Sequence, residues 1–452
     1  MPVKEEIADV IVIGGGVAGL AAARELSRDR FRVTLLEAHP RMGGRIHTRR
    51  IRGWPAPVEM GAEFVHGGNA DLWRLIRKAG VRLRKLRERH WLGNDGALAE
   101  IPDLDQRIAR VTRQITPAKA GSRSFLAFFR RYPAEVAPED WTLARSFVEG
   151  FEAAPLSAIS ARSLAEETLD EYHQYRLPDG YDQLVLALKA ACLHRAVKLR
   201  VNTEVRSVSW RRGRVEVADG TPESGEKMRY AARAVIVTLP LGVLKARTGR
   251  GAVRFQPELK RKRALINRMQ MGHVVRLVFH IRAATWRRLW PQILLAGRRD
   301  GFGFIHSQVQ GVPVWWSLSN QPVLVGWVGG PAATALLKLS ERQRCRRALR
   351  SLAEILDLPP ATVVKAVLDW QTHDWSRDPF CRGAYSFTAA GEDSSPTRLR
   401  SPVQGTIFFA GEATARGAEV GTVHGALSSG IRAAREVRRV LRVESGRARR
   451  NR

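Results

Sequence analysis

Glycines and one carboxylate near the N-terminus have the types and the spacing that bind a dinucleotide. Gly14, Gly16 and Gly19 form the pattern G-x-G-x-x-G directly after the apolar run Val10–Ile13, and Glu37 ends a second apolar run. The first glycine permits a tight turn, the second lets the backbone approach a pyrophosphate, and the third lets a helix pack on a strand. A carboxylate about 20 residues further on binds ribose hydroxyls. We therefore predict a strand–turn–helix unit whose helix N-terminus holds the phosphates.

Strands predicted later in the chain return to this unit. They are expected at residues 197–201, 204–210, 214–218, 234–238 and 407–410. A helix from about Thr422 follows the last of them, with apolar residues at helical spacing. Residues 69–175 are predicted to be mostly helical, whereas residues 254–370 mix helices with strands such as Val274–Ile281. This order indicates an α/β protein built from two interleaved domains rather than from two domains in series.

The net charge is unusual for a chain of this size. The 452 residues include 75 Lys and Arg but only 44 Asp and Glu, so the formal net charge is +31. A surface for nucleic acid or anionic membrane is one explanation, and basic residues scattered over solvated faces are the other. Because the sequence contains no zinc finger, basic zipper or RNA-binding signature, we expect no specific nucleic-acid partner and only weak, salt-dependent adhesion.

The cysteines and the apolar segments limit the class of protein further. Cys192, Cys345 and Cys381 lie far apart and form no C-x-x-C pattern, so neither a disulfide framework nor a metal site is expected. No run of about 18 apolar residues occurs, so no membrane span is expected. The polar N-terminus lacks the apolar core of a signal peptide, and we expect a cytoplasmic protein. The sequence gives no indication of oligomeric state.

Taken in order, the motifs resemble those of the flavin-dependent amine oxidase family, which includes monoamine oxidases, polyamine oxidases and histone lysine demethylases. The resemblance runs from Asp9 to about Val440. It is carried by GGGVAGLAAARELS with Glu37, by GGRIHT, VEMGAEFVHG, VTLPLGVLK and WSRDPFCRGAYSF, and by IFFAGEATARGAEVGTVHGALSSGIRAA. It implies a Rossmann-like FAD-binding domain interleaved with an α+β substrate domain. The FAD-binding domain would comprise residues 1–75, 176–250 and 371–442, the substrate domain residues 76–175 and 251–370, and a basic tail residues 443–452.

The resemblance also implies contacts to one FAD. Gly14, Gly16 and Gly19 would lie at the pyrophosphate, Glu37 at the adenosine ribose and Arg45 near the phosphates. Val205 would offer its backbone to adenine, Glu412 would meet the ribityl–phosphate region, and Val423 would present its N–H to the flavin pyrimidine. Gly44, Gly61 and Thr422 are expected to contact the cofactor as well. A helix N-terminus beside the pyrimidine would stabilise negative charge on the reduced ring.

The activity implied is oxidation of the C–N bond of a small primary or secondary amine. A hydride passes to flavin N5, the imine hydrolyses, and molecular oxygen or another acceptor reoxidises the flavin, with peroxide as the product from oxygen. Trp375, Tyr385 and Phe387 match the family's aromatic cage, and His66 matches a histidine near the substrate of some polyamine oxidases. Arg276 aligns with a lysine that usually lies near N5. Core packing is the alternative for the aromatic residues, loop stabilisation for His66, and an exposed strand position for Arg276.

Several positions depart from the family's patterns. Ala384 stands where monoamine oxidases tether FAD through a cysteine, and Cys381 lies three residues too early, so FAD should be bound non-covalently. Glu63 and Phe64 follow the turn where amino-acid oxidases carry a carboxylate-binding arginine, which argues against that substrate class. The helical domain and hairpin of histone demethylases are not expected, so histone substrates are disfavoured.

Arginine at position 276 leaves a second function open. A guanidinium cannot lose its proton and is bulkier than an ammonium group, so flavin reoxidation by oxygen could be slow. The alternative is an FAD-dependent desaturase or dehydrogenase of the same superfamily that acts on an apolar substrate such as a carotenoid or a porphyrinogen. The net charge would repel polyamines at long range, although a carboxylate such as Glu63 is expected to attract a cation into the cleft.

Overall fold

A parallel five-stranded sheet forms the centre of the nucleotide-binding region. The computed structural model describes residues 4–94, 96–166, 174–220, 228–289, 301–318 and 321–450. The sheet order is β11 (Lys198–Arg200), β3 (Val33–Leu36), β2 (Val10–Ile13), β15 (Ala234–Val237) and β24 (Ile407–Phe409), and every neighbouring pair is parallel. All residues of β2, β3, β15 and β24 are buried, as expected for strands covered on both faces. The expected α/β class is confirmed.

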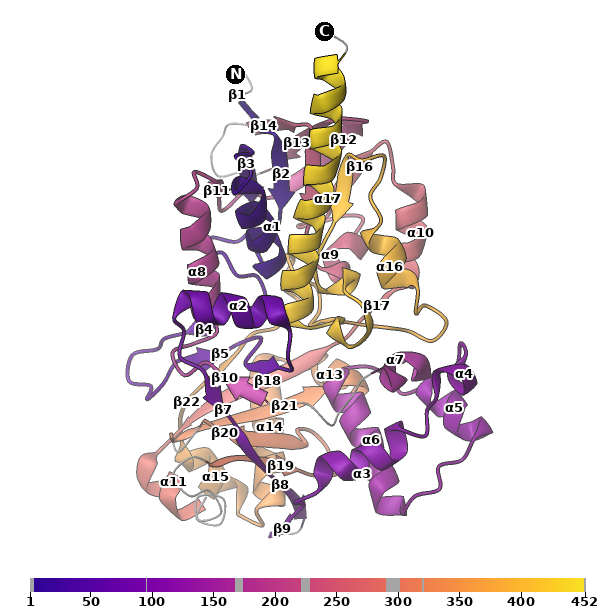
Figure 1. The fold of residues 1–452 in the computed structure, drawn as a ribbon. Helices are drawn as coiled ribbons and strands as arrows, with labels where there is room; N and C mark the ends of the chain where they lie inside the picture. The colour runs from indigo at the N-terminus through magenta and orange to yellow at the C-terminus, as the bar shows by residue number, and fades with distance from the viewer. Residues whose placement is uncertain are drawn as a thin grey trace.

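Helices cover one face of this sheet and a second sheet covers the other (Figure 1). The helices are α1 (Val17–Ser27), α8 (Asp182–Leu193), α17 (Val423–Arg450) and, at their lower end, α2 (Ala70–Ala79). The second sheet has the order β1 (Lys4–Ile7), β14 (Met228–Ala232), β13 (Arg214–Asp219), β12 (Val205–Arg211), β16 (Arg254–Gln256). Val10 and Val12 pack on the helices, whereas Ile11 and Ile13 pack toward the second sheet, because successive side chains of a strand point to opposite faces.

The first and last helices of the chain lie in close contact. A Cβ added at Gly430 of α17 would lie 2.1 Å from the Ala18 carbonyl oxygen of α1, so only glycine allows this approach. Helix α17 continues to Arg450. The basic tail expected at residues 443–452 is therefore helical as far as residue 450, and residues 451 and 452 lie outside the described part.

A seven-stranded sheet forms the second region, in the lower half of Figure 1. Its order is β22 (Val367–Thr372), β18 (Val274–Ile281), β21 (Val323–Gly329), β20 (Val314–Ser317), β19 (Gly301–His306), β8 (Arg87–Asn94), β9 (Ala97–Glu100). The strand expected at Val274–Ile281 is confirmed. The expectation of a mostly helical segment over 69–175 missed β8 and β9, because their residues alternate weakly and β8 pairs with β19, a strand distant in sequence.

Further helices and small sheets complete the second region. Helices α11 (Ala283–Leu289), α13 (Gly330–Leu336), α14 (Glu341–Ile355) and α15 (Pro360–Ala366) lie beside the seven-stranded sheet. A separate apolar cluster holds α3 (Leu104–Thr112), α4 (Pro117–Ala120), α5 (Phe125–Arg131), α6 (Pro138–Phe151) and α7 (Ala161–Ala165). One small sheet contains β6 (Phe64–His66), β10 (Gln174–Arg176) and β7 (Arg84–Lys85), and two strand pairs are β4 (Thr48–Arg49) with β5 (Val58–Glu59) and β17 (Gln270–Met271) with β23 (Ser386–Phe387).

The remaining short helices lie in the nucleotide-binding region. They are α9 (Leu241–Lys245), α10 (Lys260–Arg268), α16 (Ser395–Arg400) and the 3-10 turns η3 (Glu412–Thr414) and η4 (Gly417–Glu419). Within the described residues, no helix combines the length and the apolar character needed to cross a bilayer. The limits given above for the two interleaved domains stay a prediction.

Candidate active site

One cavity of about 1020 Å³ connects the nucleotide-binding region with the second region. Its walls at one end come from the glycine turn after β2, and those at the other end from α3, α6 and strands β8 and β19. Every residue predicted to bind the cofactor or the substrate lines this cavity, except Gly19 and Phe387. The residues that line it are Gly14, Gly16, Glu37, Gly44, Arg45, Gly61, His66, Val205, Arg276, Trp375, Tyr385, Glu412, Thr422 and Val423.

The three glycines of the first turn differ in what surrounds them. Gly14 has a φ of +107°, and a Cβ there would lie 2.5 Å from Thr238 Oγ1. A Cβ at Gly19 would lie 1.9 Å from the Gly14 carbonyl oxygen, so this residue allows the helix to pack on the turn. A Cβ at Gly16 would meet nothing within 4 Å, and this residue faces the cavity. The geometry fits a turn, a packing contact and a backbone surface open to phosphate.

Glu37 lies at the carboxyl end of β3, buried beside the same turn. Its carboxylate accepts hydrogen bonds from the Gly15 N–H (2.5 Å) and from the His39 N–H (2.8 Å). Burial raises the pKa of Glu37 above its ordinary value, although these two N–H groups oppose the shift. The Thr203 N–H donates to the Glu37 carbonyl, which brings Val205 at the start of β12 to the same end of the cavity.

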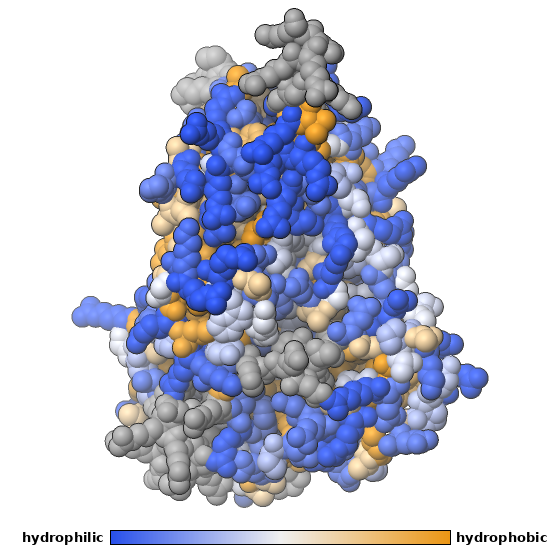
Figure 2. All heavy atoms as spheres, viewed as in Figure 1, coloured by the Kyte–Doolittle hydropathy of each residue, from blue (hydrophilic) through white to orange (hydrophobic). Residues whose placement is uncertain are grey.

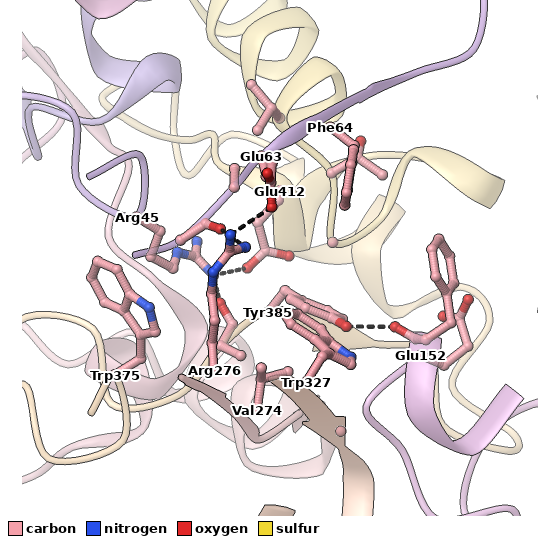
Figure 3. A pocket seen from close by; sticks show the side chains of 18 of the residues that line it. Arg45, Glu63, Phe64, Glu152, Val274, Arg276, Trp327, Trp375, Tyr385 and Glu412 are labelled. Atoms are coloured by element: carbon pink, nitrogen blue, oxygen red, sulfur yellow. Dashed lines mark hydrogen bonds and ion pairs between the residues drawn. The ribbon is translucent and has the colours of Figure 1, made fainter. Parts of the chain in front are cut away.

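Arg45 and Glu412 form an ion pair across the middle of the cavity (Figure 3). Arg45 Nη1 lies 2.9 Å from Glu412 Oε1 and donates to the Ala384 carbonyl at 2.7 Å. The other carboxylate oxygen of Glu412 accepts from the backbone N–H and the hydroxyl of Ser386. A Cβ at Gly61 would lie 1.8 Å from the Arg45 carbonyl oxygen. These contacts fix three of the predicted cofactor residues relative to one another.

The N-terminus of α17 opens onto the cavity beside these residues. Thr422 precedes the helix, and its hydroxyl donates to the Glu419 carbonyl and accepts from the Gly425 N–H at 3.0 Å. Thr422 and Val423 both line the cavity. The first N–H groups of a helix have no partners within it and carry partial positive charge, so this end suits an electron-rich ring edge.

Arg276 projects into the cavity from β18, the second strand of the seven-stranded sheet. Its side chain is buried, so the alternative of an exposed strand residue is wrong. Nη2 donates to Glu63 Oε2 at 2.5 Å, Nη1 donates to the Gly61 carbonyl at 3.3 Å, and the guanidinium lies 5.4 Å from the Trp316 ring centre. Within the described residues Arg276 Nε has no hydrogen-bond partner. A buried donor thus remains available beside Gly61.

Glu63 is neutralised by two guanidinium groups. In addition to Arg276, Arg176 Nε lies 2.9 Å from Glu63 Oε1, and Trp316 Nε1 donates to Glu63 Oε2 at 3.2 Å. Burial alone would raise the pKa of Glu63, but the Arg276 and Arg176 charges outweigh it and hold this pKa below its usual value. The expectation that Glu63 attracts a cation into the cleft is therefore wrong, because the cluster carries a net positive charge.

The predicted aromatic cage is reduced to two residues. Trp375 Nε1 donates to the Met60 carbonyl at 2.9 Å, and the Tyr385 hydroxyl donates to the Phe151 carbonyl at 2.5 Å. Both rings line the cavity, and burial raises the pKa of Tyr385. Phe387 instead packs into the apolar cluster of α3 to α7, so its placement in the cage is wrong. Its neighbour Ser386 turns toward Glu412, which directs Phe387 to the opposite side of β23.

His66 lies in β6 and faces the cavity while its backbone pairs with Gln174 of β10. Its ring centre lies 5.9 Å from that of Phe151. Burial, together with the nearby His424, lowers the pKa of His66 to about 4, so the imidazole is neutral at pH 7. His66 thus has both the strand pairing of a structural residue and the position of a substrate contact.

Comparisons with known proteins cover nearly the whole chain. The family model described as "Flavin containing amine oxidoreductase" matches residues 17–438. The chain belongs to this family. It is 30% identical to polyamine oxidase 3 of Oryza sativa subsp. japonica (97% of this chain, 91% of the relative) and 29% identical to polyamine oxidase 2 of Arabidopsis thaliana (97% and 90%). A redesigned putrescine oxidase shares the fold, with a TM-score of 0.77, 21% identity and coverage of 96% and 99%.

This flavoprotein is therefore an amine oxidase with FAD as its cofactor, and the predicted resemblance is confirmed. The residues present fit the cofactor. The backbone of Gly16 faces open space, the N-terminus of α17 opens onto the same cavity, and Arg276 Nε is a buried donor without a partner in the described part of the chain. The individual contacts assigned to FAD stay predictions.

A polar cluster at the far end of the cavity was not anticipated from the sequence. His90 Nδ1 of β8 lies 3.0 Å from His306 Nε2 of β19, and His90 Nε2 lies 3.6 Å from Glu88 Oε2. Gln174 Nε2 also donates to Glu88. Burial and the adjacent His90 lower the pKa of His306 to about 3. Glu88 and His90 are two residues apart and so lie on the same face of β8. The sequence could not place them beside His306, because that contact depends on the parallel pairing of two strands distant in the chain.

A second cluster ties the loop after β3 to the loop that carries Trp375. His39 Nε2 and His373 Nε2 lie 3.2 Å and 3.1 Å from Asp378 Oδ2. His39, Asp378 and Cys381 lie close enough together to form a potential metal-ligand set. Asp378 Oδ2 already accepts a hydrogen bond from the His373 imidazole, and burial raises the pKa of the Cys381 thiol. A hydrogen-bonded cluster accounts for these contacts.

Proposed function

We propose that this amine oxidase acts on the C–N bond of a small primary or secondary amine, with FAD held non-covalently. The observation that carries the proposal is the continuous cavity, which joins the glycine turn to the buried Arg276 and to the aromatic wall of Trp375 and Tyr385. When bound, FAD accepts the two electrons and the hydrogen removed from the carbon beside the nitrogen. Ala384 beside Arg45 has no side chain that could form a bond to it.

The cofactor would be held from both ends of the cavity. The turn of Gly14 and Gly16 would receive the pyrophosphate, and Glu37 would receive ribose hydroxyls through the lone pairs that Gly15 and His39 leave available. Val205 would meet the adenine, and Val423 would offer its N–H to the ring system. Arg45 is neutralised by Glu412, so it would contact the cofactor as part of a pair rather than as a free cation.

The charges that line the cavity would guide the amine and then favour its neutral form. Carboxylates of Glu88, Asp105 and Glu149 line the outer part, and they would attract an ammonium ion despite the positive charge of the whole protein. The inner cluster of Arg276, Arg176 and Glu63 carries one excess positive charge. A nearby positive charge lowers the pKa of an amine, so the reactive neutral form would be favoured at the inner end.

The distal cluster would bind a second polar group of the substrate. Rings of Phe304 and Trp316 connect His90 to Arg276 through contacts of 5.2 Å, 5.7 Å and 5.4 Å. Glu88 and the neutral His306 would accept hydrogen bonds from an amino group beyond this aromatic stretch. The relatives named polyamine oxidases support a substrate with more than one nitrogen.

Arg276 bears on the electron acceptor. Its guanidinium is held by Glu63 and by the Gly61 carbonyl, and it cannot deliver a proton. Oxygen would therefore be reduced to peroxide more slowly than with lysine there, and another acceptor could compete. A cytoplasmic location stays part of the proposal and is supported by three buried free cysteines.

An anaerobic titration tests the function directly. The holoenzyme would be mixed with a panel of monoamines, diamines and polyamines while flavin absorbance is recorded, and air would then be admitted. We expect at least one amine to bleach the flavin and air to restore the colour with release of peroxide. If no amine bleaches the flavin but an apolar desaturase substrate bleaches it, the alternative desaturase or dehydrogenase activity would replace this proposal.

A further inference from the structure

Helix α8 is apolar on two opposite faces. Its inner face packs into the core of the nucleotide-binding region through Leu184, Val185, Leu188 and Cys192. Its outer face carries Leu186 and Leu193, whose side chains are 50% and 54% exposed. Seven residues separate these leucines, so they lie on the same side of the helix, two turns apart. Exposed aliphatic side chains that repeat on one face of a helix indicate a surface that another body can cover.

The apolar outer face of α8 is bordered by two cations and by one carboxylate, Asp182, that is already paired with Arg50. Lys189 lies between the two leucines, one turn from Leu186, and Arg195 follows the end of the helix. No Asp or Glu occurs between Asp182 and Glu204. Lys189 and Arg195 are exposed, and neither forms an ion pair with another described residue. The helix therefore presents aliphatic side chains together with uncompensated positive charge.

Neighbouring carboxylates do not cancel this charge. Asp182 lies 2.7 Å from Arg50, and Glu6 is paired with Arg200 at 2.8 Å and with Lys198 at 3.5 Å. Val201, directly after β11, adds a third exposed aliphatic side chain. In the view of Figure 2, apolar side chains reach the surface along the edge where Figure 1 places α8.

We propose that this surface, defined by Leu186, Lys189, Leu193, Arg195 and Val201, docks on an anionic lipid membrane. The aliphatic side chains would enter the headgroup layer and the two cations would contact lipid phosphates, which together supply the two signals that stable peripheral binding requires. Nucleic acid is disfavoured as the partner because hydrated phosphate and base edges offer nothing to exposed leucines, and the surface has no aromatic residue for stacking.

Vesicle sedimentation of the holoenzyme tests this surface. Vesicles of phosphatidylcholine alone would be compared with vesicles that contain phosphatidylcholine and phosphatidylserine in equal amounts, at low and at high salt. We expect binding to the anionic vesicles that weakens with salt. Lys189→Glu/Arg195→Glu should reduce the partition coefficient at least tenfold, because each cation near such a membrane contributes roughly fivefold. Leu186→Ser/Leu193→Ser should weaken binding at low and at high salt alike.

Matched variants at other surfaces separate this site from general charge and hydrophobicity. Arg342→Glu/Arg346→Glu on exposed positions of α14 makes the same change in net charge, and Val364→Ser/Leu368→Ser removes two aliphatic side chains that are equally exposed. Both controls should bind vesicles within twofold of the parent protein. The proposal would be overturned if the α14 variant lost as much vesicle binding as Lys189→Glu/Arg195→Glu, or if the parent protein did not bind anionic vesicles. It would also be overturned if Lys189→Glu/Arg195→Glu weakened binding to duplex DNA but not to vesicles. Turnover of a soluble amine should be unchanged in all four variants, so failure of this proposal is distinct from failure of the amine oxidase assignment.

Discussion

Replacing Glu63 with glutamine tests the buried ion-pair cluster. The neutral amide keeps the size of the side chain, but Arg276 and Arg176 stay charged and out of contact with water. At an effective dielectric constant of about 20, a pair at the 2.9 Å of Arg176 and Glu63 is worth about 6 kcal/mol of attraction. Desolvation offsets part of this, and breaking a buried pair typically costs about 3–5 kcal/mol. We expect Glu63→Gln to lower the free energy of unfolding by that amount.

Urea unfolding, followed by circular dichroism and tryptophan fluorescence, measures this loss. The matched control is Glu100→Gln, because Glu100 pairs with Arg89 at 2.7 Å while both side chains are 37% exposed. An exposed pair contributes at most about 1 kcal/mol, so the control should unfold near the parent midpoint. In Glu63→Gln/Arg276→Met one of the two uncompensated charges is removed, and stability should partly recover. A loss no larger than that of Glu100→Gln, or a double variant less stable than Glu63→Gln, would refute the reasoning.

Four further outcomes are expected. Arg276→Lys should speed the reoxidation of reduced flavin by oxygen, measured by stopped flow, and an unchanged rate would contradict the role given to this residue. Glu37→Ala should lower the flavin content of the purified protein; full occupancy would count against the ribose contact. Tyr385→Phe loses the bond to the Phe151 carbonyl, and it should change turnover more than flavin content, whereas the reverse pattern would indicate a packing role. His66 has a folded pKa of about 4, below the unfolded value of 6.5, so its contribution to stability is complete above pH 6.5 and falls as the pH drops toward 4. Between pH 7.5 and pH 5 this amounts to about 2 kcal/mol, and His66→Gln should show a pH dependence smaller by that amount in urea unfolding.

The nucleotide-binding region could be predicted because its signals are local in sequence. Gly14 and Gly19 are required by a φ of +107° and by a 1.9 Å approach, and such needs exclude every residue except glycine. Strands β2, β3 and β15 are short apolar runs, which indicate burial on both faces. Strands β8 and β9 were missed because β8 pairs with β19, more than 200 residues away in the chain, and β9 pairs only with β8.

The charged interior of the site could not be predicted in the same way. The motif around Glu63 indicated its neighbourhood, but only the fold brings Arg176 of β10 and Arg276 of β18 to its two oxygens. The sequence therefore predicted a carboxylate that attracts a cationic amine, whereas the fold forms a cluster with a net positive charge. Phe387 was predicted to face the cavity, but its ring lies on the opposite side of β23. A two-residue strand has no periodicity from which the direction of its side chains could be inferred.

The contact between α1 and α17 has a consequence for synthesis of the chain. Gly430 packs on Ala18, and β24 completes the parallel sheet beside β15, so the cradle of the glycine turn needs residues from both ends of the polypeptide. Ribosomes add about 5–20 residues each second, so the turn made first waits roughly 20–80 seconds for its last partner. During that time the apolar faces of β2 and α1 are uncovered on the nascent chain. Production of the enzyme should accordingly benefit from chaperones and from slow expression at low temperature, conditions that protect such an intermediate from aggregation.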